Sequence, residues 1–154
     1  MIGVLIIAHA PLASALAQCA SHVYACDLSR AESKLRVLDV PAGADVATYG
    51  TTARALLAEV DDGAGVLVLT DAFGATPGNI AAQLSNPPRV SVVAGVNLPM
   101  LLRALCYRDG KLADLVDKAI AGGMQGVMQV VTTPVHNQNS RPTGDDHARV
   151  HHPQ

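Results

Sequence analysis

The sequence predicts an α/β fold in which a doubly wound, mostly parallel sheet lies between two layers of helices. Continuous apolar runs recur along the chain, as expected for strands buried on both faces. Segments with helical apolar spacing alternate with these runs, which is typical of crossover units. Apolar residues make up 49% of the 154 residues but aromatic residues only 3%. Small aliphatic side chains must therefore build the core, and they suit helices packed closely on a sheet.

Five segments are predicted to be strands. IGVLIIA (2–8) and GVLVLTD (65–71) are apolar almost throughout, LRVLDV (35–40) and RVSVVAGV (89–96) are similar, and GVMQVV (126–131) is a short final strand. Right-handed crossovers with one central reversal of winding give a doubly wound sheet. In the flavodoxin-like order 2-1-3-4, the first and third strands are neighbours.

Helical spacing and turn residues mark the segments between the strands. Pro11 suits the first turn of the first helix, and Thr76 is the predicted N-cap of another, with Pro77 at its first helical position. Asp109 and Gly110 separate the last two helices. The predicted helices cover residues 12–23, 45–60, 76–84, 97–108 and 111–123.

The chain is predicted to form one domain over residues 1–131, followed by a disordered polar tail over 132–154. The tail contains four histidines, which we interpret as solvated residues rather than as a metal site: His136, His147, His151 and His152. A formal net charge of −2 shows no basic footprint and argues against nucleic acid as the main partner. No apolar run approaches the roughly 18 residues of a membrane span.

Cysteine usage indicates a reducing compartment. Cys19, Cys26 and Cys106 form no CxxC pair, and an odd number of thiols without a signal peptide favours the cytoplasm. We interpret the three as small packing residues.

Two polar residues end neighbouring strands of the predicted sheet. His9 follows the first strand and Asp71 ends the third. Taken alone, His9 has three interpretations: a surface residue, a metal ligand or a nucleophile. In open α/β sheets, ligands bind beyond the carboxyl ends of the strands at the reversal of winding, where these two side chains would meet. A carboxylate that binds one imidazole nitrogen fixes the tautomer and leaves the other nitrogen as a nucleophile.

The segment AFGATPGN, directly after Asp71, suggests what His9 attacks. Gly74 permits close backbone approach, and Ala75 and Thr76 stand at a helix start, where amide groups favour anions. Such a site suits a phosphoryl group carried on His9, although an acyl group fits the same chemistry. No GxGxxG or GxxxxGK[ST] motif is present, so no nucleotide cofactor is expected, and no metal is called for.

Three further residues are weaker candidates for this site. Asn97 begins a helix after the fourth strand and offers a neutral hydrogen-bonding group or a helix cap. Phe73, the single phenylalanine, either belongs to the core or covers the site. Pro11 follows the histidine closely.

Three segments carry a resemblance to a known family. VLIIAHAPLASAL, GVLVLTDAFGATPGNIA and VVAGVNLPMLLRAL resemble the signature segments of the mannose-type enzyme IIA domain of the bacterial sugar phosphotransferase system. The resemblance extends from residue 2 to about residue 131. It implies that His9 is transiently phosphorylated on Nε2 by the phosphocarrier protein HPr, that Asp71 orients His9, and that Thr76 lies near the phosphate.

The same resemblance implies a C-terminal antiparallel strand that is exchanged between the subunits of a homodimer. Ala10 and Phe73 depart from the glycine and tryptophan common in the family, which affects the docking face rather than the chemistry. No linked IIB segment follows, so we expect the acceptor to be a separate IIB protein that serves a membrane sugar permease. The alternatives are a regulatory module without onward transfer and an unrelated ligand-binding or hydrolytic α/β domain.

Overall fold

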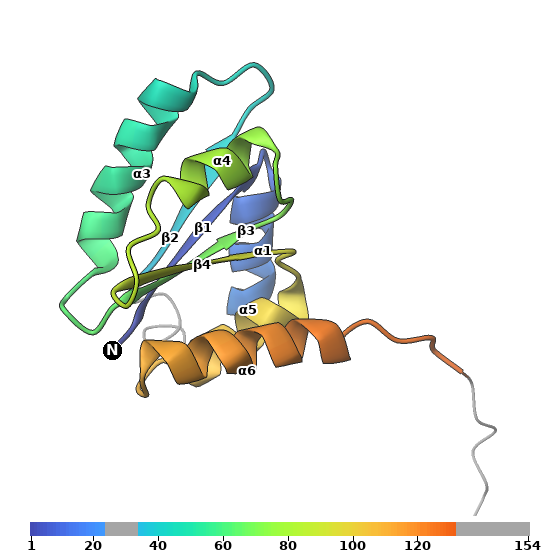
Figure 1. The fold of residues 1–154 in the computed structure, drawn as a ribbon. Coiled ribbons are helices and arrows are strands. Elements are labelled where there is room, and N and C mark those ends of the chain that lie inside the picture. Colours follow the sequence, from blue (N-terminus) through green and yellow to red (C-terminus); the bar gives the residue numbers. More distant parts are fainter. Residues whose placement is uncertain (24–33, 132–154) are drawn as a thin grey trace, which may run out of the picture.

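The computed structural model describes residues 1–23 and 34–131, and it contains a four-stranded parallel sheet (Figure 1). The strand order β2-β1-β3-β4 is the predicted one. The strands are β1 (Gly3–His9), β2 (Leu35–Val40), β3 (Val66–Thr70) and β4 (Val90–Ala94). The two central strands, β1 and β3, are the most buried, because both of their faces are covered.

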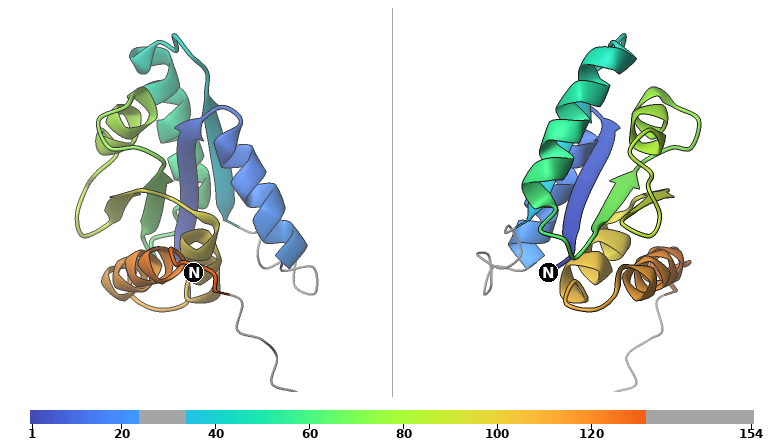
Figure 2. Two further views of the ribbon diagram at one scale, coloured as in Figure 1. Left: turned by 90° about the vertical axis from the view of Figure 1, so that its right-hand side faces the viewer. Right: turned by 60° about the vertical axis from the view of Figure 1, so that its left-hand side comes forward.

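Helices cover both faces of this sheet, which confirms the doubly wound α/β class (Figure 2). Helices α1 (Leu12–Val23), α5 (Leu98–Cys106) and α6 (Leu112–Gln125) pack on one face. Helices α3 (Val46–Val60) and α4 (Thr76–Ala82) pack on the other. The topology brings the carboxyl ends of β1 and β3 side by side at one edge of the molecule.

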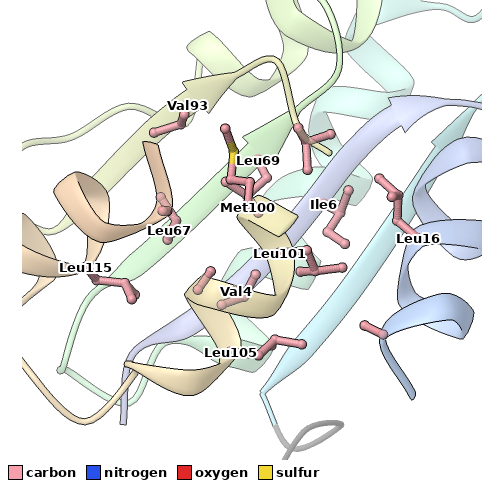
Figure 3. Packing of buried hydrophobic residues seen from close by; sticks show 14 of the residues in the cluster. Val4, Ile6, Leu16, Leu67, Leu69, Val93, Met100, Leu101, Leu105 and Leu115 are labelled. Atoms are coloured by element: carbon pink, nitrogen blue, oxygen red, sulfur yellow. The ribbon is translucent and has the colours of Figure 1, made fainter. Parts of the chain in front are cut away.

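The larger core cluster shows how aliphatic side chains replace aromatic ones. Strand residues such as Val4, Ile6 and Leu67 are fully buried against Leu101 of α5 (Figure 3). Alternate strand residues, such as Leu5 and Ile7, belong to the second cluster under α3 and α4. Each face of β1 therefore has its own helix layer, which holds the strand, and the turn that follows it, in place.

Residues 126–131, the predicted final strand, form no strand among the residues that the structure describes. Helix α6 continues to Gln125, and residues 127–131 have no strand partner among the described residues. Val127, Met128, Val130 and Val131 are each at least 72% exposed. Within the described residues, the apolar segment that predicted a strand therefore does not pair with either edge of its own sheet. The predicted tail, residues 132–154, lies outside the described residues.

Two further predictions about local structure need correction. Thr76 is not the N-cap of α4: Ala75 takes that position with an extended backbone, and Thr76 is the first helical residue ahead of Pro77. Cys19 and Cys106 are exposed rather than packed in the core, since each lies on the outer side of its helix. Cys26 lies outside the described residues. Of the helices in residues 1–23 and 34–131, none has the length and apolar character needed to cross a membrane.

Candidate phosphoryl-acceptor site

The site is built on the ends of two paired strands. β1 and β3 are parallel and their last paired positions are Ile7 and Thr70, so Asp71 follows one residue and His9 two residues beyond that pair. Asp71 is in turn tied to the next strand segment, because its carbonyl oxygen accepts a hydrogen bond from the Gly95 N–H at 3.1 Å. The sheet register thus brings together two residues that are 62 positions apart.

One carboxylate oxygen of Asp71 contacts both the backbone and the ring of His9. Asp71 Oδ2 accepts a hydrogen bond from the His9 backbone N–H at 3.0 Å and lies 2.7 Å from His9 Nδ1. The other oxygen, Oδ1, accepts from the Ala72 N–H at 2.9 Å. Because the backbone and the ring of His9 share one acceptor, the ring cannot rotate without losing a short polar contact.

The protonation state of Asp71 follows from its surroundings. Partial burial opposes the charged carboxylate, but the hydrogen bonds from the His9 N–H, the His9 ring and the Ala72 N–H outweigh it, so the pKa of Asp71 is lowered. An ionised carboxylate only accepts hydrogen bonds. His9 Nδ1 must therefore carry the proton in this contact, and the lone pair of the neutral ring lies on Nε2.

His9 and Asp71 differ in exposure in the way that a nucleophile and its orienting group require. The His9 side chain is 52% exposed, whereas the Asp71 side chain is 13% exposed. The imidazole is thus accessible to a docking partner, while the carboxylate is shielded and keeps its hydrogen bonds. This is the arrangement of a base and its orienter.

The loop after Asp71 leads directly into α4. Gly74 has a φ of +82°, a conformation that favours glycine, and an added Cβ there meets nothing within 4 Å. Gly78 is tightly constrained, because a Cβ at this position would lie 2.5 Å from the Ala72 carbonyl oxygen. α4 therefore packs against the start of the loop, while Gly74, Ala75 and Thr76 remain partly or fully exposed near the carboxyl end of β3.

The weaker candidates separate clearly. Phe73 is 95% exposed and is not a core residue. Asn97 is the N-cap of α5: its Oδ1 accepts from the Met100 N–H at 2.9 Å, and its Nδ2 donates to the Gly123 carbonyl oxygen at 3.1 Å. Both polar atoms of the Asn97 side chain are therefore used, one to cap α5 and the other to join α5 to α6. The structure thus supports the capping interpretation. Pro11 is exposed, and its carbonyl oxygen accepts from the Ala15 N–H at 3.0 Å as α1 begins.

Sequence reasoning missed Asp39 and Ser14. Ser14 Oγ lies 2.6 Å from Asp39 Oδ2, and the Ser14 N–H donates to Asp39 Oδ1 at 3.2 Å. Asp39 pairs with Ala8, next to His9, in the β1–β2 register. The available signal was an acidic residue near the carboxyl end of the apolar segment LRVLDV, on the strand that neighbours β1.

A small cavity of about 230 Å³ lies beside the loop, between α4 and β4. Thr70, Phe73 and Gly74 are among the residues that line it. The Thr70 side chain is buried, and within the described residues its Oγ1 has no hydrogen-bond partner. In the same ranges, 1–23 and 34–131, no three histidine, cysteine or acidic side chains are grouped so as to hold a metal ion.

Comparisons with known proteins identify the family of this chain. A family model described as "PTS system fructose IIA component" matches residues 3–120. The chain is 31% identical over 127 residues to the PTS system fructose-specific EIIA component of Bacillus subtilis, covering 81% of this chain and 84% of that protein. It is 33% identical over 108 residues to the PTS system mannose-specific EIIAB component of Escherichia coli K12, covering 68% of this chain but only 33% of that protein.

Solved structures resemble the fold as well. The phosphotransferase system component EIIA from Streptococcus agalactiae superimposes with a TM-score of 0.70 at 28% identity, covering 84% of this chain and 97% of that chain. The mannose/sorbose-specific IIA subunit from Enterococcus faecalis superimposes with a TM-score of 0.74 at 21% identity, covering 86% and 96%, which is evidence for the fold alone. The chain belongs to the family of fructose- and mannose-type IIA components of the phosphotransferase system.

Proposed function

We propose that this protein accepts a phosphoryl group from phospho-HPr on His9 Nε2 and passes it to a IIB protein for sugar uptake. Family membership implies phosphoryl transfer within a sugar phosphotransferase system. The observation that supports the site most directly is the pair of contacts from His9 to Asp71 Oδ2, at 3.0 and 2.7 Å. They present one exposed ring nitrogen with its lone pair free for attack.

The proposed step is an in-line exchange of one N–P bond for another. The Nε2 lone pair of His9 forms a bond to phosphorus as the N–P bond of the donor phosphohistidine breaks, and the electron pair of that bond returns to the donor ring. The His9 ring gains positive charge while Nδ1 keeps its proton. Asp71, ionised at neutral pH, stabilises that charge across the 2.7 Å contact.

The phosphoryl oxygens are assigned to the loop after Asp71. Thr76 provides a hydroxyl, and Gly74 and Ala75 provide backbone amide groups near the amino end of α4. Phe73 in this loop is almost fully exposed, and we assign it to the face on which partner proteins dock. We place the reaction in the cytoplasm, with membrane contact only through a permease complex.

Labelling from phosphoenolpyruvate tests the proposal. Wild-type protein incubated with enzyme I, HPr and phosphoenolpyruvate should gain about one acid-labile phosphate per chain. His9→Ala should gain none, whereas His22→Ala, which removes an exposed histidine from the last turn of α1, should be labelled normally. Equal labelling of His9→Ala and wild type would overturn the assignment of His9, and an unlabelled wild type would contradict acceptance of a phosphoryl group from phospho-HPr.

Addition of IIB proteins then tests onward transfer. Loss of label to a IIB protein supports the role in sugar uptake. Stable label in the presence of candidate IIB proteins favours a regulatory module, in which the phosphorylation state of His9 controls a partner.

We further propose that the chain forms a homodimer through residues 126–131. Four exposed apolar side chains follow α6, and β4 is an edge strand with no neighbour on its outer side within the described chain. An apolar groove of about 350 Å³ lies next to the end of β4 and is lined in part by Val93, Met100 and Met124. Light scattering should show a dimer that Val130→Asp weakens, while Gln129→Asp, at the neighbouring polar position, should remain dimeric.

A further inference from the structure

A second carboxylate flanks the turn that carries His9, on the strand opposite to Asp71. β1 lies between β2 and β3, and Asp39 is one residue from the end of β2. Asp71 accepts from one backbone N–H and contacts one side chain of His9, while Asp39 accepts from one backbone N–H and one side chain of Ser14. Both strands next to β1 therefore hold the segment that follows it.

The beginning of α1 explains why Asp39 is needed. Pro11 immediately precedes the helix, and its side chain has no oxygen to accept a hydrogen bond from the first turn. Asp39 supplies the missing acceptor from another strand, because its Oδ1 accepts from the Ser14 N–H at 3.2 Å. The Ser14 hydroxyl adds a short 2.6 Å bond to Oδ2, and its Oγ also lies 3.1 Å from the Pro11 carbonyl oxygen.

The segment from His9, the last residue of β1, to Pro11 is thus fixed at both of its ends. Asp71 holds its first residue from β3, the Ala10 N–H donates to the Val40 carbonyl oxygen of β2 at 3.0 Å, and Asp39 holds the helix that follows. Without Asp39, the β2 side would keep the Ala10 bond, but α1 would lose the acceptor that fixes its first turn.

We propose that Asp39 is a positioning residue for phosphoryl transfer: acting through Ser14, it fixes the amino end of α1 and thereby the direction in which His9 presents its reactive nitrogen. The inference rests on the proposed function of His9. Asp39 acts on the turn and not on the phosphoryl group, so it should change the rate of the transfer step more than the affinity for the donor.

The kinetics of loading from phospho-HPr test this role. Asp39→Ala should lower kcat roughly tenfold with KM for phospho-HPr changed less than about twofold. Asp39→Asn keeps one acceptor oxygen, so its kcat should lie between those of Asp39→Ala and wild type. Ser14→Ala should also slow transfer, whereas Ser14→Thr should keep the wild-type rate because it keeps the hydroxyl. The double variant with Asp39→Ala and Ser14→Ala should be little slower than Asp39→Ala alone, because both substitutions remove the same contact.

A matched carboxylate at the other end of the sheet provides the control. Asp61 also accepts from one backbone N–H, that of Gly63 at 2.9 Å, and from one side chain, that of Arg89 at 2.9 Å, but it lies before the amino end of β3. Asp61→Ala should lose stability without a change in kcat. A wild-type kcat for Asp39→Ala, or an equal loss in Asp61→Ala, would overturn the proposal.

Amide hydrogen exchange keeps this test separate from the proposed function. If wild-type protein takes up no phosphate, the proposed function of His9 is wrong. Amide exchange in the segment around His9 can still be measured in the unmodified protein. Asp39→Ala should then speed exchange of the His9 and Ala10 amides by roughly tenfold, because their turn has lost one of its anchors. Unchanged exchange at both amides, with the fold intact by circular dichroism, would exclude a positioning role.

Discussion

Asp71 Oδ2 contacts His9 twice, through the backbone N–H at 3.0 Å and through ring Nδ1 at 2.7 Å. A single oxygen atom therefore fixes both the position of the residue and the orientation of its ring. The same carboxylate is anchored at the end of β3 by the Ala72 N–H. The orientation of the His9 ring therefore depends on the position of the end of β3. This coupling leads to predictions on both transfer and stability.

Replacing Asp71 by Asn should slow phosphoryl loading by about 10- to 100-fold while the fold is retained. The amide keeps most of the shape but cannot stabilise a positive charge on the ring, and a hydrogen bond to a charged group contributes about 1.5–3 kcal/mol. Initial rates with phospho-HPr measure the effect. Asp62→Asn, at the opposite end of the sheet, should load at the wild-type rate, and an unchanged rate in Asp71→Asn would remove Asp71 from the mechanism.

Gly78→Ala should disturb the loop that follows Asp71. The added Cβ would lie 2.5 Å from the Ala72 carbonyl oxygen, a backbone atom, so that the loop or α4 must shift. Overpacking of this kind costs about 1–3 kcal/mol, and we expect transfer to slow together with the loss of stability. Urea unfolding and loading rates measure both effects. Gly110→Ala is the control, because its Cβ would be 3.8 Å from the nearest atom; equal behaviour of the two variants would contradict the prediction.

Thr70→Val should raise the free energy of unfolding by about 1 kcal/mol. The Thr70 side chain is buried, and its Oγ1 has no hydrogen-bond partner among the described residues, so that the hydroxyl carries a desolvation penalty that a methyl group of similar size avoids. Chemical denaturation measures the change. Thr48→Val should show no gain, because the Thr48 hydroxyl donates to Asp45 at 2.7 Å. A loss of stability in Thr70→Val would indicate that the hydroxyl is satisfied in solution.

Acid should destabilise the fold between about pH 4 and pH 2. Hydrogen bonds from the Lys34 side chain and the Ala64 N–H lower the pKa of Asp62 to about 2. The pKa of Asp61 is lowered as well, by the Gly63 N–H first and then by Arg89. A carboxylate whose pKa is lower in the folded state contributes stability above its unfolded pKa, and this stability disappears as the pH falls through the folded pKa.

Urea unfolding at pH 7, 4 and 2 measures this dependence. Asp62→Asn should lower the free energy of unfolding at pH 7. It should also make the difference in this free energy between pH 7 and pH 2 smaller than in wild type. Parallel pH profiles for the variant and wild type would exclude a contribution from Asp62.

The sequence by itself determined the order and type of the main elements, and it predicted that His9 and Asp71 lie together at the ends of two neighbouring strands. Continuous apolar runs and helical spacing are local patterns, and the core of this protein is made of the same aliphatic residues that produce them. His9 and Asp71 were predictable because they end strands that parallel pairing must bring to one edge. The cap at Asn97 was predictable from local sequence, because an asparagine stands directly before a helical segment.

Only the tertiary structure decided what these residues contact. Asp39 reaches Ser14 across 25 positions, and Asp71 reaches His9 across 62, so neither pairing is contained in any local spacing. The N-cap of α4 at Ala75 rather than Thr76 depends on loop geometry, and the segment after α6 does not pair with a sheet edge within the described residues. Periodicity states which face of an element is apolar, but the register between distant strands determines which polar groups meet at their ends.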